Sequence, residues 1–336
     1  MLKYQFEVFC NVSNINYSQS SQYINQVQQI ITTAEKYNYD GSLFHFNHLM
    51  VDPFILASNV LQHTNNFVPI IAALPSYNSP VATVKKVQSL TYIYGKKVNL
   101  NMITGAAKHE LEQISDLLEH PSRYQRLQEY IEVVKLLLES DEPIDYKGTY
   151  YNYNKLHLGT PVPKHLMPDI YVAGSSDAAI QLAGKLAQVA MTHPGPIEHF
   201  KQNFLSKINH PSLKVGIEIG IITRKTSAEA WEVARQLYPQ SFLGMLHTKV
   251  KLNSESTWLR QMAELGLSSE THDDVFWMGA FTSGGQNNPL LVGSYEDVAA
   301  YFEKYLQLGV NVIILTELRS ADEFEHVDQV MKLVRS

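Results

Sequence analysis

The sequence predicts an α/β fold, specifically a (β/α)8 TIM barrel, and two observations indicate it. Short apolar runs that suit strands alternate along the chain with longer amphipathic runs that suit helices. The apolar runs number eight, and each is followed by a helix-like run, as in a closed parallel barrel. Alternation alone does not decide closure, so a doubly wound open sheet is the competing architecture, and the count of eight favours the barrel.

The expected strands are continuous apolar stretches, because a strand covered on both faces of a parallel sheet has no polar side. The stretch FVPIIAAL at 67–74 is the clearest of them. The other seven are expected at 4–10, 42–47, 97–104, 168–176, 189–193, 214–224 and 311–318.

Helices are expected between these strands, where apolar residues recur at helical spacing; in 20–36 they fall on one face. A late helix has the best-marked ends. Ser294 is an N-cap candidate, Asp297 stands three residues on, and Gly309 can adopt the left-handed conformation that ends a helix. The remaining helices are expected at 53–63, 80–94, 122–139, up to about 187 after the fifth strand, from near 196, at 227–238 and at 322–334.

The whole chain, 1–336, is expected to form a single barrel domain, since α/β barrels often exceed about 250 residues. Three segments interrupt the strand–helix rhythm and are interpreted as insertions, at about 105–121, 145–165 and 239–290. The second is rich in tyrosine around Gly148 and predicts a small hairpin. The third has no clean period and precedes the last strand–helix units.

Composition excludes several classes of protein. The net charge is −6 and the basic residues are scattered, which argues against a nucleic-acid surface. We find no apolar run long enough to span a membrane and no signal peptide at the start, and expect a cytoplasmic protein. Cys10 is the one cysteine, so an internal disulfide framework and a multi-cysteine metal site are excluded, and no other metal motif occurs.

The carboxyl ends of the strands carry the chemistry of a barrel, and the best local signal there is Gly174, Ser175 and Ser176. A strand ends, small residues turn the chain, and a helix begins. Unpaired N–H groups at a helix N-terminus attract an anion, and two hydroxyls add donors, which suits the phosphate of FMN. An ordinary N-cap is the alternative, because serine and aspartate favour that position anyway.

Asn101 and Thr104 flank the end of the fourth strand, where they could bond a polyol or an isoalloxazine edge, or merely cap the strand. His45, His48 and His193 stand near strand ends and are either acid–base candidates or structural histidines. A Walker loop and a GxGxxG turn after a strand are both missing, so P-loop and Rossmann sites are not supported.

Several stretches, taken in order, resemble one family of enzymes. They include NMITG (101–105) and PDIYVAGSSDAAIQLAGKLA (168–187), together with 122–139, 145–156, 216–231 and 277–316. This ordered set resembles the bacterial luciferase-like flavin monooxygenases, in particular the alkanesulfonate monooxygenase branch. The resemblance covers most of 97–334, and the first three strands fit it more weakly.

The resemblance implies a role for each matching position. Ser175 and Ser176 would hold the FMN phosphate, with the Tyr124 hydroxyl as a further donor, and Asn101 would contact the flavin or its ribityl chain. The segment 239–290 would shield the active site, and its Gly-Gly at 284–285 gives the flexibility that a closing lid needs.

Other positions depart from the pattern of sulfonate-cleaving relatives. Where those relatives have an arginine and a histidine on the seventh strand, this chain has Glu218 and Gly220. Ser283, Met50, Leu318, and Cys10 or Asn11 stand where they have arginine, cysteine, tyrosine and histidine. A sulfonate is a permanent anion best held by arginine, so we predict that alkanesulfonates are poor substrates.

The leading hypothesis is a two-component monooxygenase that uses O2 on a small organic substrate. A separate NAD(P)H flavin reductase would supply reduced FMN, Glu218 and His193 are the catalytic candidates, and relatives are commonly homodimers or tetramers. Two alternatives stay open. One is an oxidoreductase that transfers hydride with a flavin or deazaflavin, and the other is a flavin-binding subunit that is not catalytic or that stabilises a partner.

Overall fold

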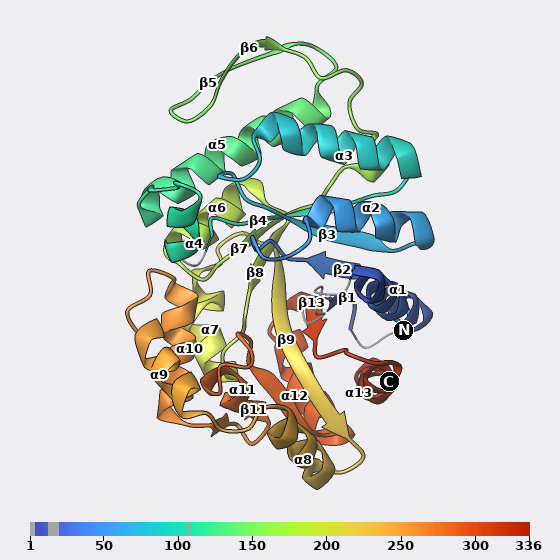
Figure 1. Cartoon of the computed structure of the whole chain (residues 1–336), viewed down its shortest axis with the longest axis vertical. Coiled ribbons are helices and arrows are strands. Elements are labelled where there is room, and N and C mark those ends of the chain that lie inside the picture. Colours follow the sequence, from blue (N-terminus) through green and yellow to red (C-terminus); the bar gives the residue numbers. More distant parts are fainter. Residues whose placement is uncertain (1–3, 13–19, 106–107) are drawn as a thin grey trace.

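The computed structural model describes residues 4–12, 20–105 and 108–336, and in them eight parallel strands close into a barrel (Figure 1). Closure is direct, because β1 pairs with β13 and β8 pairs with β9. The barrel prediction is therefore confirmed and the open sheet is excluded. The eight strands are β1 (Glu7–Asn11), β2 (Gly41–Phe44), β3 (Val68–Ala73), β4 (Asn99–Met102), β7 (Ile170–Ala173), β8 (Val189–Thr192), β9 (Lys214–Arg224) and β13 (Val310–Thr316).

Helices surround the barrel, and several begin and end where the sequence predicts. The Ser294 hydroxyl accepts from the Asp297 N–H while the Asp297 carboxylate accepts from the Ser294 N–H, so the expected cap is a complete capping box. Gly309 has φ 92°, the left-handed conformation expected after that helix. The helices are α1 (Ser20–Lys36), α2 (Pro53–His63), α3 (Pro80–Tyr94), α4 (Lys108–Gln113), α5 (His120–Glu139), α6 (Asp177–Leu186), α7 (Ile197–Asn203), α8 (Ser227–Leu237), α12 (Tyr295–Gln307) and α13 (Ala321–Arg335), with 3-10 turns at Lys164–Leu166 and Leu205–Lys207.

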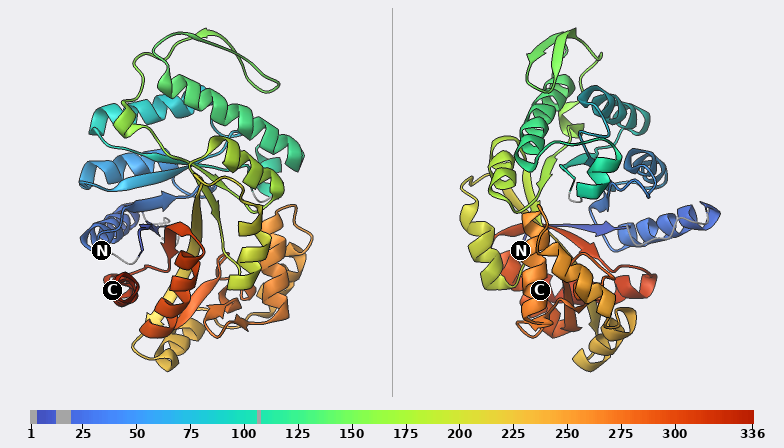
Figure 2. Two further views of the ribbon diagram at one scale, coloured as in Figure 1. Left: turned by 180° about the vertical axis from the view of Figure 1, so that it is seen from behind. Right: turned by 60° about the vertical axis from the view of Figure 1, so that its left-hand side comes forward.

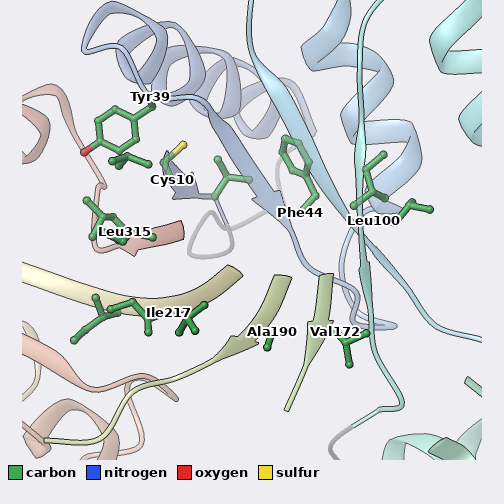
Figure 3. Close-up of a cluster of buried hydrophobic side chains, with 14 of the residues drawn as sticks. Cys10, Tyr39, Phe44, Leu100, Val172, Ala190, Ile217 and Leu315 are labelled. Atoms are coloured by element: carbon green, nitrogen blue, oxygen red, sulfur yellow. The ribbon is translucent and has the colours of Figure 1, made fainter. Parts of the chain in front are cut away.

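Alternate side chains of each strand point to opposite sides of the barrel wall. Outward residues such as Cys10, Phe44 and Ile217 pack under the helices (Figure 3), and burial raises the pKa of the Cys10 thiol to about 12. Inward residues form a separate apolar plug: Phe9, Leu43, Ile70, Tyr171, Val189, Met191, Val312 and Ile314. A residue two positions beyond a plug residue also points inward, at the carboxyl end of its strand.

The segment 239–290 is ordered, although its sequence shows no clean period. It forms α9 (Phe242–Lys251), α10 (Thr257–Ser268), β10 (Thr271–His272), β11 (Phe276–Trp277) and α11 (Gly279–Thr282). The second half of β9 runs past the barrel and pairs with β12 (Leu290–Ser294), a strand the sequence analysis missed. Figure 2 shows α9 and α10 on the flank of the molecule opposite α1 and α13.

The expected hairpin is present as β5 (Ile144–Lys147) and β6 (Asn152–Leu156), which pair antiparallel. Within the described ranges, no helix is both long enough and apolar enough to cross a bilayer.

Candidate active site

The carboxyl ends of the strands place a ring of polar side chains above the apolar plug. Asn11 follows Phe9, His45 follows Leu43 and His193 follows Met191, in each case two residues on and hence inward. Glu218 of β9 is buried at the centre of this ring. Its Oε1 accepts from Asn11 Nδ2 at 2.6 Å, from His45 Nε2 at 3.2 Å and from Asn288 Nδ2 at 3.3 Å, while its Oε2 lies 3.8 Å from His193 Nε2.

Two glycines on β9 flank Glu218 on the inner face. A Cβ on Gly216 would lie 2.3 Å from Met191 Sδ, and one on Gly220 would lie 2.1 Å from the Leu290 side chain and 2.8 Å from Thr316 Oγ1. These distances are shorter than a Cβ contact allows, so the side chains of Met191, Leu290 and Thr316 already fill this space. A histidine at 220, expected from sulfonate-cleaving relatives, would require Leu290 and Thr316 to move.

The three ionisable groups of the ring hold different charges near neutral pH. Burial alone would raise the pKa of Glu218, but His45 and His193 together with hydrogen bonds lower it to about 2. Burial would lower the pKa of His45, but the Glu218 carboxylate outweighs it and the pKa is raised. Burial lowers the pKa of His193, against the attraction of Glu218. The ring therefore contains an ionised Glu218 carboxylate, a His45 whose protonated form the carboxylate favours, and a His193 whose protonated form burial disfavours.

His193 is held between β8 and the insertion. The Trp258 ring of α10 lies over the His193 ring, with centroids 4.2 Å apart. The His193 Nδ1 atom is buried and has no hydrogen-bond partner among the described residues. A buried nitrogen without a partner costs free energy, and a ligand at the barrel mouth would supply that partner.

The turn between β7 and α6 gathers the predicted phosphate-binding residues. Ser176 is the N-cap of α6, since its hydroxyl accepts from the Ala179 N–H at 3.2 Å, so the capping interpretation is correct. Gly174 has φ 140°, and a Cβ there would lie 2.9 Å from the Tyr124 hydroxyl. Ser175 is buried and donates to Gln261 of α10 at 3.3 Å. Capping and anion binding are compatible, because the cap accepts one N–H and leaves the other N–H groups of the first turn free.

Asn101 and Thr104 are both buried at the end of β4. The Asn101 Oδ1 atom, like His193 Nδ1, has no partner among the described groups. A carbonyl oxygen in this state can accept from a ring N–H, as an isoalloxazine would offer. Helix N-terminus, hydroxyls and unsatisfied amide together suit a flavin with a phosphate tail.

The structure thus places the predicted residues in two neighbouring groups. Glu218, His193 and Asn101 point into the barrel mouth, while Tyr124, Gly174, Ser175 and Ser176 surround the start of α6. His48 is not among the hydrogen-bond partners of Glu218, and both its ring nitrogens are buried with no hydrogen-bond partner in the described part of the chain. The described residues contain no group of three or more His, Cys, Asp or Glu side chains able to hold a metal ion.

Sequence reasoning missed three contributors to the ring. Asn11 was noted only as a departure from the family pattern, although its place two residues after Phe9 would have predicted an inward side chain. Asn288 and Trp258 come from the insertion, whose sequence gave no register, and their positions depend on tertiary packing alone.

A closed barrel with a buried polar mouth, and with a serine-capped helix starting after β7, has the architecture of enzymes that work at the carboxyl ends of their strands. The chain matches the luciferase-like monooxygenase family over residues 4–311 and belongs to it. The expected resemblance to this family is confirmed, and with it the class of luciferase-like oxidoreductases.

Individual relatives agree with this assignment. The chain is 41% identical over 316 residues to BtrO of Niallia circulans, the 4-(gamma-L-glutamylamino)butanoyl-[BtrI acyl-carrier protein] monooxygenase, covering 94% of this chain and 93% of BtrO. The EDTA monooxygenase EmoA from Chelativorans sp. BNC1 has the same fold, with TM-score 0.78, 15% identity and coverage of 98% and 93%. An F420-dependent secondary alcohol dehydrogenase also shares it, with TM-score 0.71, 18% identity and coverage of 99% and 100%. The fold alone therefore does not choose between flavin and deazaflavin.

Proposed function

We propose that this protein is a reduced-FMN-dependent monooxygenase that inserts one atom of O2 into an acyl group presented on a carrier protein. The observation that carries the proposal is the buried polar mouth, where Asn101 Oδ1 and His193 Nδ1 have no hydrogen-bond partner among the residues that the structure describes. Family membership supports the reaction class, and the 41% identity to BtrO supports the substrate class.

The residues around α6 and β4 would hold the cofactor. Ser175, Ser176 and the first N–H groups of α6 suit its phosphate, with the Tyr124 hydroxyl beside them, and Gly174 lets the backbone approach closely. Asn101 and Thr104 suit the polar edge of the ring and the ribityl chain. Bound reduced FMN supplies two electrons, so that one oxygen atom enters a C–H bond of the substrate and the other leaves as water.

His193 is the proposed proton acceptor. Its Nε2 faces the Glu218 carboxylate, which favours the tautomer with the proton on Nε2 and leaves Nδ1 as the acceptor. Its lowered pKa keeps the ring neutral at pH 7. Trp258 covers one face of the ring and limits the access of water to it.

Glu218 is proposed to select the substrate. Its ionised carboxylate opposes an anionic group at the mouth and tolerates a neutral or cationic one. An acyl thioester is neutral at its reacting end, so it meets this requirement, whereas a sulfonate does not.

We propose that reduced FMN comes from a separate NAD(P)H reductase, since the sequence contains no dinucleotide-binding GxGxxG turn of its own. An anaerobic absorbance titration with reduced FMN tests binding. Oxygen is then admitted with 4-(γ-L-glutamylamino)butanoyl-BtrI, and mass spectrometry should detect an acyl group larger by one oxygen atom. Failure to bind reduced FMN, or turnover with reduced F420 without O2, would contradict the proposal.

A further inference from the structure

Helix α9 of the insertion turns its apolar face toward solvent. Six large apolar side chains within eleven residues are between 36% and 77% exposed: Phe242, Leu243, Met245, Leu246, Val250 and Leu252. A surface helix of a monomeric protein normally buries such a face against the core. An outward apolar face on an ordered helix indicates a surface that a partner covers.

The way α9 packs prevents this face from turning inward. Gly244 and Thr248, one turn apart, are its only two buried residues. A Cβ on Gly244 would lie 2.2 Å from the backbone carbonyl of Ser283 and 2.5 Å from that of Thr282, so this side of α9 contacts α11 directly. Larger apolar side chains cannot take that place, and the outward orientation is a fixed property of the fold.

The charged residues of the α9 segment itself are basic. Residues 239–254 contain no acidic residue and include the exposed Lys249 and the partly buried Lys251, whose ammonium lies 4.0 Å from the centre of the Phe281 ring, in a chain whose net charge is −6. The complementary surface is an apolar centre with carboxylates around it. An acidic protein partner fits this description, whereas a second copy would bring the same cations against it.

The size of the face indicates a transient partner. Six partly exposed side chains amount to a few hundred Å², the size of the largest patches on monomers. A standard stable interface covers about 800 Å² on each partner. A visiting protein that docks, reacts and leaves needs only a small contact.

The position of α9 connects the face to the active site. α9 packs beside α10, and α10 supplies Trp258 over His193 and Gln261 beside Ser175. We propose that α9 is the docking surface for the acyl-carrier protein that brings the substrate, with an acidic, partly apolar face on the carrier. This inference rests on the proposed function for its choice of partner.

Binding is tested separately from turnover. The probe is unacylated BtrI with a fluorescent label, and anisotropy reports its affinity for the whole protein. Phe242→Ser/Val250→Ser and Lys249→Glu should each weaken binding about tenfold or more, and added salt should weaken it further. Leu333→Ser on α13 and Lys164→Glu are the matched exposed controls, and they should bind BtrI as the unchanged protein does.

Turnover then separates docking from chemistry. With the acyl group on BtrI, kcat/KM of both α9 variants should fall about tenfold. With the same acyl group on pantetheine, their kcat/KM should equal that of the unchanged protein. Equal loss on both substrates would make α9 a lid and overturn docking, as would absent or unchanged BtrI binding. A change of mass by light scattering would identify α9 as a contact between copies, which also overturns it. BtrI binding that depends on α9 without turnover would support docking while refuting the proposed reaction.

Discussion

Glu218 is a buried carboxylate whose stability contribution depends on its partner His45. The pKa of Glu218 is lowered, so its contribution is present above pH 4.5 and is lost as the pH falls toward about 2. The pKa of His45 is raised, so its contribution is present below pH 6.5 and is lost as the pH rises through the raised value. The ion pair therefore stabilises the fold between these limits.

Glu218→Gln should lower the free energy of unfolding by about 1–3 kcal/mol at pH 6, because it leaves His45 without its counter-charge. The pKa of His45 is raised and its proton is lost as the pH rises through that value, so the loss of stability should be smaller at pH 9 than at pH 6. Urea denaturation at the two pH values measures the loss in the free energy of unfolding. Glu232→Gln, at an exposed position, is the control. An equal loss at both pH values would contradict the ion pair.

His193 carries the proposed proton transfer, so its replacement should affect turnover and leave flavin binding intact. His193→Gln should lower kcat by about 100-fold. Since the pKa of His193 is lowered by burial, activity of the unchanged enzyme should fall only below pH 6.5, as the ring takes up a proton. A pH–rate profile of the unchanged enzyme should show this fall in activity at acid pH, and the profile of His193→Gln should not show it.

At the residue scale, sequence predicted what depends on local chain chemistry. Ser176 and Ser294 are caps in the structure, as serine before a helix predicts. The partners of Glu218 could not be predicted in the same way, because Asn11, His45 and Asn288 meet it only when the barrel closes.

At the element scale, the start of α6 separates ligand binding from helix capping. Ser176→Ala removes the cap and should cost about 1 kcal/mol of stability. Ser175→Ala removes a hydroxyl that does not cap α6 but donates to Gln261, so it should weaken reduced-FMN binding about tenfold at a stability cost of about 1 kcal/mol. Absorbance titration and thermal unfolding of both variants test the pair. If Ser175→Ala binds normally, the phosphate lies elsewhere.

Helix α10 protects the mouth through Trp258. Trp258→Ala should admit water to His193, raise the pKa of that ring toward 6.5, and increase hydrogen peroxide release per reduced FMN consumed several-fold. Trp258→Phe keeps a ring over His193 and serves as the control. A peroxidase-coupled assay measures the uncoupling, and an unchanged peroxide yield would show that α10 does not shield the site.

The bounds of α1, α2 and α3 match the sequence prediction. Amphipathic spacing and helix caps depend on residues that are close in the sequence, so they can be recognised without the fold. The helices of 239–290 were not predicted; in α9 the only buried residues are Gly244 and Thr248, so its core-facing side carries no large apolar residue that would mark a helix. β12 was missed because it pairs with an extension of β9 that no local pattern indicates.

At the scale of the whole molecule, closure of the barrel determines the charge that a substrate meets. Closure brings β1, β2, β8 and β9 together, so that their polar ends form one ring. Glu218 and His45 neutralise each other there, and His193 is neutral, so the ring offers no spare cation to an anionic substrate.

Alkanesulfonates should therefore be poor substrates. A sulfonate at the mouth would lie against the ionised Glu218, and an unpaired like charge in a buried site costs several kcal/mol, or at least about 100-fold in kcat/KM. Sulfite release from octanesulfonate with reduced FMN and O2 measures this rate, and a neutral octanoyl thioester is the matched control. Glu218→Gln should bring the kcat/KM for octanesulfonate closer to that for the octanoyl thioester, because it removes the charge that repels the sulfonate. Efficient sulfite release by the unchanged enzyme would show that a cation elsewhere in the closed barrel reaches the sulfonate.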